Sequence, residues 1–290
     1  MNKVILLGTG TPNACFDAMG PSVALIIHDK VYVVDAGAGV VRQLTKLYNK
    51  GYHCCSPKLL DTLFLTHLHS DHTVGLPDFI YTPWVLERDH PLTIVGPNGT
   101  KEMCGHLQEA YTIDINFRIH GFEKANDSGY LVNVIQTKDG LCHEDENVKV
   151  YALTVEHGLE SYAYKFVFDG KSVVISGDTC YLESMCEFCR DVDLLVHEVF
   201  YSAGLKQREP KWQVYHSHVH TSSYDLARLA SIAKPKKLVT YHRIYHMDFY
   251  NDAIDVVNER NKRENAILEE IKSKYDGIVM NGHDLDEYEI

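Results

Sequence analysis

The sequence has 290 residues, of which 45% are hydrophobic and 23% are charged, and its formal net charge is −12. This composition is typical of a soluble globular protein with a sizeable core. The acidic balance argues against a polyanion as the main partner, because nucleic-acid binders need a positive surface to displace counterions. The apolar run within residues 1–8 is too short for a signal peptide or a membrane helix, so we expect no membrane association.

Eight cysteines without regular spacing or a secretion signal are typical of free thiols in a reducing cytosol, which predicts a cytoplasmic protein. Cys186 and Cys189 form one Cys-x-x-C pair on a predicted helix, without a second pair. This favours a structural role over a redox or zinc site. No linker, repeat or low-complexity tract interrupts the chain, so residues 1–290 are predicted to form a single domain.

The first half of the chain predicts strands that alternate with turns and helices. Residues 4–7 predict a buried strand, and residues 23–27 and 31–34 predict a hairpin that turns at 28–30. Helical spacing follows at 40–48, and an apolar strand is expected at 63–65. Further elements are a strand at 92–95, a helix from 101 to about 111 and a polar hairpin within 121–148.

The second half predicts a longer series of strands, with helices only towards its end. Strands are expected at 148–155, 162–168, 172–176, 194–196, 237–240 and 278–280. Residues 201–217 are expected to be irregular, and helices are expected at 224–233 and 253–274.

The most informative segment is a loop that follows the apolar strand at 63–65 and has the spacing His-x-His-x-Asp-His. Its members are His67, His69, Asp71 and His72. Imidazole nitrogens and carboxylate oxygens are ligands of zinc and similar first-row dications. Because His67 and His69 alternate, they can converge on one ion, while Asp71 and His72 can turn towards a second.

Other strands also end in His, Asp or Glu. These residues are His157, Asp178, His197, Glu198 and His242. Strand ends on one rim of a sheet place their side chains around a common point, where α/β proteins usually bind ligands. Each histidine taken alone is more often structural, but the repetition favours a shared site.

These motifs resemble those of the metallo-β-lactamase-fold hydrolases, whose hallmark is the His-x-His-x-Asp-His loop. The turn at 8–12, the segment after His72 and the Thr-Tyr-His sequence at 240–242 narrow the resemblance to the branch of tRNase Z and of the arylsulfatases and phosphodiesterases of this fold. The resemblance covers nearly the whole chain. It implies an α/β fold, an αββα sandwich of two mixed sheets packed face to face with helices outside.

The resemblance also implies two divalent metal ions, with zinc preferred and manganese or iron as alternatives. His67, His69 and His157 would hold one ion, Asp71, His72 and His242 the second, and Asp178 would bridge them. Asp35 would brace the metal loop without being a ligand. Two such ions can hold a hydroxide that is nucleophilic at neutral pH, and Asp71 is also a candidate for orienting it.

Two further residues bear on the substrate. Family members that process tRNA 3′ ends have a His-Glu motif after a strand and a downstream histidine before Thr or Ser. Here the His-Glu motif matches His197 and Glu198, and the downstream histidine matches His220. The resemblance implies that Glu198 holds His220, which would protonate the leaving oxygen or stabilise the charged oxygens. The alternative is that Glu198 is a carboxylate at a helix start or on the surface. His216 and His218 crowd the same motif, so the register stays open, although Thr221 and Ser222 directly follow His220.

The chain departs from tRNase Z between His157 and Asp178, where tRNA-processing members insert a long arm and this chain has only residues for a short hairpin. This favours hydrolysis of a small phosphodiester or sulfate ester. The alternatives are a tRNA 3′-end endonuclease without the usual arm and, less favoured, a lactonase or β-lactamase. A metal-dependent binding protein is the non-enzyme alternative, and a homodimer stays open.

Aromatic and basic residues flanking the motifs are candidates for a substrate pocket. The aromatic candidates are Tyr81, Trp84, Trp212, Tyr215, Tyr245, Phe249 and Tyr250. Several of them are expected to be core residues instead. Lys206, Arg208 and Lys211 could meet an anionic substrate, although a solvated loop is the more ordinary explanation.

Overall fold

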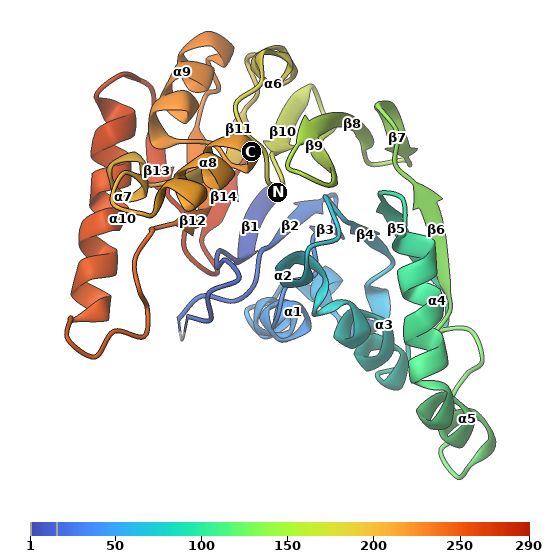
Figure 1. Ribbon diagram of the computed structural model, residues 1–290. Helices are drawn as coiled ribbons and strands as arrows, with labels where there is room; N and C mark the ends of the chain where they lie inside the picture. Colours follow the sequence, from blue (N-terminus) through green and yellow to red (C-terminus); the bar gives the residue numbers. More distant parts are fainter. Residues whose placement is uncertain (1, 16) are drawn as a thin grey trace. The chain divides into compact units, whose positions relative to one another are not determined.

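The computed structural model describes residues 2–15 and 17–290, which divide into two compact units. The first unit contains the chain up to Gly8, together with Met19–Thr137 and Asp284–Glu289. The second contains Lys138–His283 and the described part of Thr9–Ala18. Each unit is built on one sheet (Figure 1). The expectation of one domain stays a prediction.

The first sheet has seven strands among the described residues, in the order β14-β1-β2-β3-β4-β5-β6. β1, β2 and β3 pair antiparallel, whereas β3 to β6 pair parallel, so the sheet is mixed. β14 pairs antiparallel with β1. The strands are β1 (Lys3–Gly8), β2 (Ser22–Ile27), β3 (Lys30–Val34), β4 (Thr62–Phe64), β5 (Leu92–Gly96), β6 (Val132–Gln136) and β14 (Glu287–Glu289).

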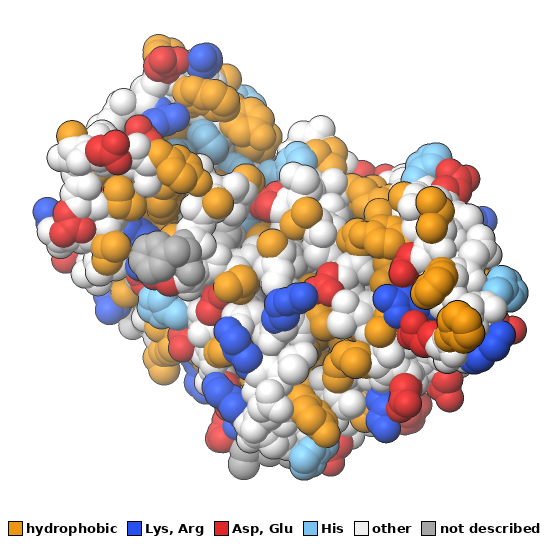
Figure 2. All heavy atoms as spheres, turned by 90° about the horizontal axis from the view of Figure 1, so that it is seen from below, with side chains coloured by type: hydrophobic (Ala, Val, Ile, Leu, Met, Phe, Trp, Pro, Cys, Tyr) orange, Lys and Arg blue, Asp and Glu red, His pale blue; other side chains and the backbone are white. Residues whose placement is uncertain are grey.

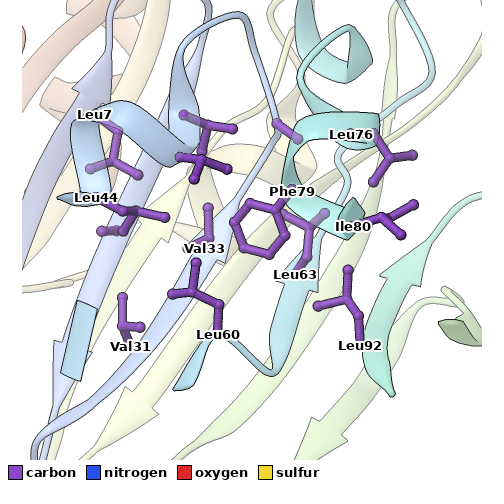
Figure 3. Packing of buried hydrophobic residues seen from close by; sticks show 14 of the residues in the cluster. Leu7, Val31, Val33, Leu44, Leu60, Leu63, Leu76, Phe79, Ile80 and Leu92 are labelled. Atoms are coloured by element: carbon purple, nitrogen blue, oxygen red, sulfur yellow. The ribbon is translucent and has the colours of Figure 1, made fainter. Parts of the chain in front are cut away.

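The core of the first unit lies where its helices pack on this sheet (Figure 3). Helix α1 buries Val40, Val41, Leu44 and Leu47, a spacing that forms one apolar stripe. The helical elements of the unit are α1 (Val40–Asn49), η1 (His53–Cys55), η2 (Pro57–Leu59), α2 (Ser70–Thr73), α3 (Leu76–Val85), α4 (Thr100–Ala110) and α5 (Thr112–His120).

The second sheet also has seven strands among the described residues, in the order β13-β12-β11-β10-β9-β8-β7. β7 to β10 pair antiparallel and β10 to β13 pair parallel, so this sheet is mixed as well. The strands are β7 (Gly140–Glu144), β8 (Lys149–Glu156), β9 (Glu160–Phe168), β10 (Lys171–Ile175), β11 (Leu194–Phe200), β12 (Leu238–Ile244) and β13 (Val279–Asn281).

Five helices accompany this sheet in the described part of the second unit. They are α6 (Glu183–Phe188), α7 (Ser202–Leu205), α8 (Pro210–Val219), α9 (Ser223–Ala233) and α10 (Val256–Lys272). Helix α9 begins with an N-cap in which the hydroxyl of Ser222 accepts a hydrogen bond from the backbone N–H of Asp225. Its buried face, together with Ile267 and Ile271 of α10, belongs to the core of this unit.

The expected α/β class with two mixed sheets is confirmed, and most predicted elements are present. The hairpin turns at His28 and Asp29, which both have positive φ, as a tight hairpin turn requires. Two expectations are wrong. Residues 121–148 do not form a hairpin, because β6 joins the first sheet and β7 the second. Residues 201–217 are not irregular, because they contain α7 and most of α8.

Strands β11 and β12 run further than the sequence predicts. β11 continues past Glu198 to Phe200, and β12 continues past His242 to Ile244. The register between the two strands shifts after Glu198. His242 lies at this irregularity with φ 43°, a left-handed conformation that is uncommon for residues other than glycine. The bulge therefore redirects the side chains in the middle of a buried strand pair.

Candidate functional site

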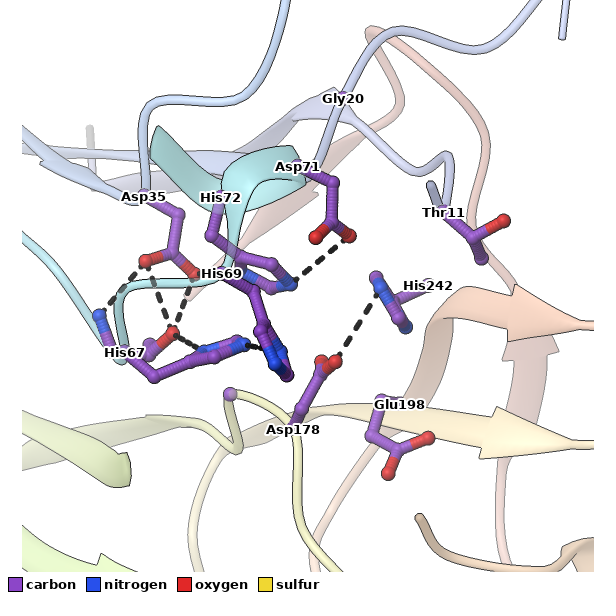
Figure 4. Close-up of polar contacts among 12 residues, drawn as sticks. Thr11, Gly20, Asp35, His67, His69, Asp71, His72, Asp178, Glu198 and His242 are labelled. Atoms are coloured by element: carbon purple, nitrogen blue, oxygen red, sulfur yellow. Dashed lines mark hydrogen bonds and ion pairs between the residues drawn. The ribbon is translucent and has the colours of Figure 1, made fainter. Parts of the chain in front are cut away.

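The His-x-His-x-Asp-His loop of the first unit leads from β4 into α2. Nε2 of His67 and Nδ1 of His69 lie 3.1 Å apart. Two imidazole nitrogens bound to one tetrahedral zinc are about 3.3 Å apart, given bond lengths of about 2.0–2.1 Å. The two rings therefore already present their nitrogens at a spacing that one metal ion can share (Figure 4).

Asp35 organises this loop from the end of β3. Its carboxylate accepts hydrogen bonds from the backbone N–H of Thr66 at 2.8 Å and from the Thr66 hydroxyl at 2.9 Å. Oδ2 of Asp35 also lies 2.8 Å from Nδ1 of His72. All three residues are buried. With Nδ1 held by the carboxylate, Nε2 of His72 is left to serve as a ligand, and it lies 3.6 Å from Oδ2 of Asp71.

Thr66 connects the same carboxylate to His67. Its hydroxyl donates to Asp35 and lies 3.0 Å from Nδ1 of His67, so the ring nitrogen is the donor in that contact. Nε2 of His67 then carries the lone pair that a metal needs. The sequence analysis did not single out Thr66; its position directly before the first histidine was the available signal.

The second unit gathers three histidines around Asp178, which follows β10. Oδ2 of Asp178 lies 3.5 Å from Nε2 of His242, 3.6 Å from Nε2 of His157 and 3.9 Å from Nδ1 of His220. Asp178 and the three histidines are all buried. One carboxylate oxygen that faces several imidazole nitrogens in a buried setting is typical of a metal site.

His157 follows β8 and is fixed by the end of α8. Its Nδ1 lies 2.6 Å from the carbonyl oxygen of Val219 and donates to it, which directs Nε2 towards Asp178. Burial lowers the pKa of His157, although the Asp178 carboxylate acts in the opposite direction. The neutral imidazole is therefore favoured, and this is the form that binds metal.

Glu198 is a completely buried carboxylate in the middle of β11. Its Oε1 accepts hydrogen bonds from the backbone N–H groups of Thr179 at 3.2 Å and Thr221 at 3.0 Å. The same oxygen lies 3.2 Å from Nδ1 of His220. This arrangement fixes the ring of His220 through one nitrogen and leaves Nε2 available for proton transfer.

The structure shows which of the three neighbouring histidines, His216, His218 or His220, lies beside Glu198. His218 is exposed, and its Nδ1 lies 2.7 Å from the carbonyl of Val214 within the helix. His216 packs against His220 and His246 instead of contacting Glu198. Burial lowers the pKa of His216 to about 4, with His220 and Arg208 as further causes. Burial lowers the pKa of His246 to about 3, with His216 as the next largest cause. Within the second unit, His220 is thus the histidine brought to Glu198.

The proposed aromatic pocket residues separate into two groups. Tyr81 and Trp84 belong to the core of the first unit, Tyr245 belongs to that of the second, and Phe249 packs against the latter. Trp212, Tyr215 and Tyr250 are exposed. Cys186 and Cys189 lie in the core of the second unit, as expected for a structural role, and none of the described cysteines forms a disulfide.

The donor sets of both units fit divalent metal ions on chemical grounds. Each set combines imidazole nitrogens with a carboxylate, the donor types that zinc and other first-row dications take. Three histidines of these sets, His72, His67 and His157, also have a second ring nitrogen held by a carboxylate, hydroxyl or carbonyl oxygen. Such outer contacts are what metal-binding histidines require.

The sequence of this chain is similar to those of known proteins. The model of a family described as "Beta-lactamase superfamily domain" matches residues 31–243. A protein named ribonuclease Z from Mycobacterium marinum is 30% identical over 237 residues, which cover 79% of this chain and 82% of that protein.

Two solved structures have the same fold. The metallo-β-lactamase-fold protein YhfI from Bacillus subtilis has a TM-score of 0.72 and 18% identity over 100% of both chains. The short form of human tRNase Z has a TM-score of 0.69 and 20% identity over 99% of both chains. Among the described residues, no helix has the length and apolar character needed to cross a membrane.

Proposed function

Because this chain belongs to the β-lactamase superfamily, with relatives named ribonuclease Z, we propose that it is an endonuclease that hydrolyses a phosphodiester bond at the 3′ end of tRNA precursors. That it is a metal-dependent hydrolase of the metallo-β-lactamase fold follows from the family. The names of the relatives favour tRNA over the small ester that the sequence analysis preferred. The observation that carries the proposal is the contact between His220 and Glu198.

We assign the metal ligands by the donors of each unit and by the motifs of the sequence. His67, His69 and His157 would hold one ion, Asp71, His72 and His242 would hold the other, and Asp178 would serve both. The predominance of imidazole nitrogen favours zinc over manganese. When bound, two such ions supply a nucleophile at neutral pH and neutralise charge on the reacting phosphate.

The chain's own residues then have separate tasks. Asp35 and the carbonyl of Val219 hold His72 and His157 in the orientation that presents Nε2. Glu198 stabilises the imidazolium form of His220, whose Nε2 proton is transferred to the leaving oxygen of the phosphodiester. The sugar hydroxyl that leaves has a high pKa, so its departure as an alkoxide is slow. Transfer of the His220 proton to the leaving oxygen as the P–O bond breaks lowers this barrier.

A second candidate function is hydrolysis of a small phosphodiester or sulfate ester. It is favoured by the short turn at Asp169 and Gly170, which is all that separates β9 from β10. The family resemblance places a long tRNA-gripping arm in this part of the chain, and the described residues between His157 and Asp178 form only a hairpin. An endonuclease with this hairpin must obtain its hold on RNA elsewhere.

Three substrates compared on the same protein distinguish the two functions. The zinc-loaded and manganese-loaded forms are assayed with a precursor tRNA, bis(p-nitrophenyl) phosphate and p-nitrophenyl sulfate, and a chelator-treated sample is the control. The proposal expects metal-dependent cleavage of the precursor with higher kcat/KM than the nitrophenyl esters. Turnover of the small esters alone would favour the second function, and no turnover with saturating metal would contradict both.

A further inference from the structure

Two rings of helix α8 and the ring of the residue directly after it form a row that ends at the proposed general acid. Trp212 and His216 are four residues apart, so they lie on one side of the helix, and His220 is its C-cap residue. The ring centroids of Trp212 and His216 are 6.1 Å apart with an angle of 35° between the planes, and those of His216 and His220 are 5.6 Å apart at 29°. Tyr215 contacts both Trp212 and His216 edge-on.

The outer end of this row is open to solvent, although its inner end is buried. Trp212 is 39% and Tyr215 44% exposed, whereas His220 is only 7% exposed. His216 also contacts His246 edge-on, with the ring centroids 4.6 Å apart. Large aromatic rings that serve only as core are normally buried, so the exposed parts of Trp212 and Tyr215 can contact another flat group.

Positive charge accompanies the exposed rings. The segment from α7 to the start of α8 contains Lys206, Arg208 and Lys211 and one carboxylate, Glu209. Lys211 pairs with Glu209 at 3.1 Å and also lies 5.3 Å from the centre of the Trp212 ring. On the face that Figure 2 shows, basic side chains are interspersed with acidic ones. This segment therefore carries a local excess of cations in a chain whose net charge is −12.

We propose that Trp212 and Tyr215 stack on bases of unpaired RNA nucleotides next to the scissile phosphodiester, while Lys206 and Arg208 neutralise neighbouring backbone phosphates. This inference rests on the proposed function, because it names the part of an RNA substrate that α8 binds. Exposed aromatic rings beside cations are how proteins bind single-stranded nucleic acid without strong sequence preference. Such a platform would also supply part of the hold on RNA that the short β9–β10 hairpin does not provide.

Tryptophan fluorescence tests the stacking directly. The chain has two tryptophans, and Trp84 is only 1% exposed, so quenching by a ligand in solution reports Trp212. The metal-loaded protein is titrated with a short single-stranded oligoribonucleotide whose phosphorothioate linkages slow hydrolysis. Its Kd is measured in parallel from the anisotropy of a labelled copy, for the wild type and for each variant.

The variants separate stacking from a general effect on the helix. Trp212→Ala and Tyr215→Ala are each expected to raise the Kd by about 5- to 100-fold, since stacking on one base contributes that much to affinity. Trp212→Phe should recover most of the affinity. Val214→Ala is the matched control, because Val214 is 60% exposed on the opposite side of the same helix, and its Kd should equal that of the wild type.

Each outcome decides the inference. An unchanged Kd in Trp212→Ala would overturn it, as would a raised KM for bis(p-nitrophenyl) phosphate without any change in RNA affinity, which would make α8 a pocket for an aryl leaving group. If the wild type binds RNA with quenching that Trp212→Ala loses, but hydrolyses no phosphodiester, the stacking holds and the proposed function fails. If the wild type hydrolyses precursor tRNA, and both alanine variants keep the wild-type Kd and kcat/KM, the proposed function holds and the stacking fails.

Discussion

Nδ1 of His220 lies 3.2 Å from Oε1 of Glu198, an oxygen that also accepts two backbone hydrogen bonds and is completely buried. Because the carboxylate is fixed from three sides, it determines both the orientation of the ring and which of its nitrogens faces the substrate. The pair belongs to one unit of the molecule and does not depend on the metal loop for its geometry. Mutations of this pair can therefore separate its contribution to catalysis from metal binding.

Replacing His220 by Ala should lower kcat by about 10²- to 10⁴-fold, the usual contribution of a general acid. Metal content, measured by elemental analysis of the purified protein, should stay at the wild-type value. Glu198→Gln should lower kcat as well, since the imidazolium loses its stabilising charge. His218→Ala is the control, because this exposed histidine contacts the carbonyl oxygen of Val214 in its own helix. Loss of metal in His220→Ala would show that this residue is a ligand instead.

Replacing Asp35 by Asn should weaken metal binding by about 10- to 100-fold, the typical effect of losing an outer carboxylate. Asn tolerates the left-handed conformation of Asp35, which has φ 63°, so the change mainly removes charge. Zinc affinity is measured by competition with a chromophoric chelator. The matched control is Asp78→Asn, which removes a carboxylate that pairs with Arg42 at the surface of the same unit. Equal affinity in both variants would disprove the bracing role of Asp35.

Replacing Arg88 by Met should reduce the free energy of unfolding by about 3–5 kcal/mol, because the buried hydrogen-bond acceptors lose a charged donor. Burial lowers the pKa of this guanidinium to about 10, so it is still charged at neutral pH. It donates to the carbonyl oxygens of Leu60, Phe79, Ile80 and Gly129. Urea denaturation measures the loss. Arg42→Ala, which removes an exposed ion pair, should cost less than about 1 kcal/mol.

The stability of the first unit should depend on pH through Glu287. A hydrogen bond from Tyr52 and the nearby Lys3 hold the pKa of this carboxyl below its usual range. A group with a lowered folded-state pKa stabilises the protein above its unfolded pKa of about 4.3, and the contribution is lost as the pH falls through the lower folded value. The urea midpoint of Glu287→Gln should thus lie below that of the wild type at pH 7, and the gap should narrow below about pH 4. A gap that does not change with pH would contradict this account.

The metal loop and most strands follow from the sequence because local patterns specify them. The His-x-His-x-Asp-His spacing is contiguous, and apolar runs bounded by turns predict β1 to β5 well. Helix α8 was missed because its exposed aromatic residues give no apolar stripe, so periodicity carried no signal there. The ends of β11 and β12 were also missed, since His197 and His242 looked like strand terminators but lie within buried, bulged strands.

The outer contacts of the site could be predicted only in part. Asp35 was expected as a brace from the family resemblance, whereas the roles of Thr66 and the carbonyl of Val219 depend on backbone positions that spacing does not encode. The choice of His220 over His216 and His218 needed coordinates for the same reason. All three histidines fit the motif in sequence, and only one of them lies beside Glu198.

The most direct test of the central claim is to map the cleavage of a precursor tRNA by the zinc-loaded wild type. The account predicts one metal-dependent cut at the 3′ end of the tRNA, abolished by a chelator and slowed at least 100-fold in His220→Ala. An intact precursor under conditions in which bis(p-nitrophenyl) phosphate is hydrolysed would contradict the claim that RNA is the substrate.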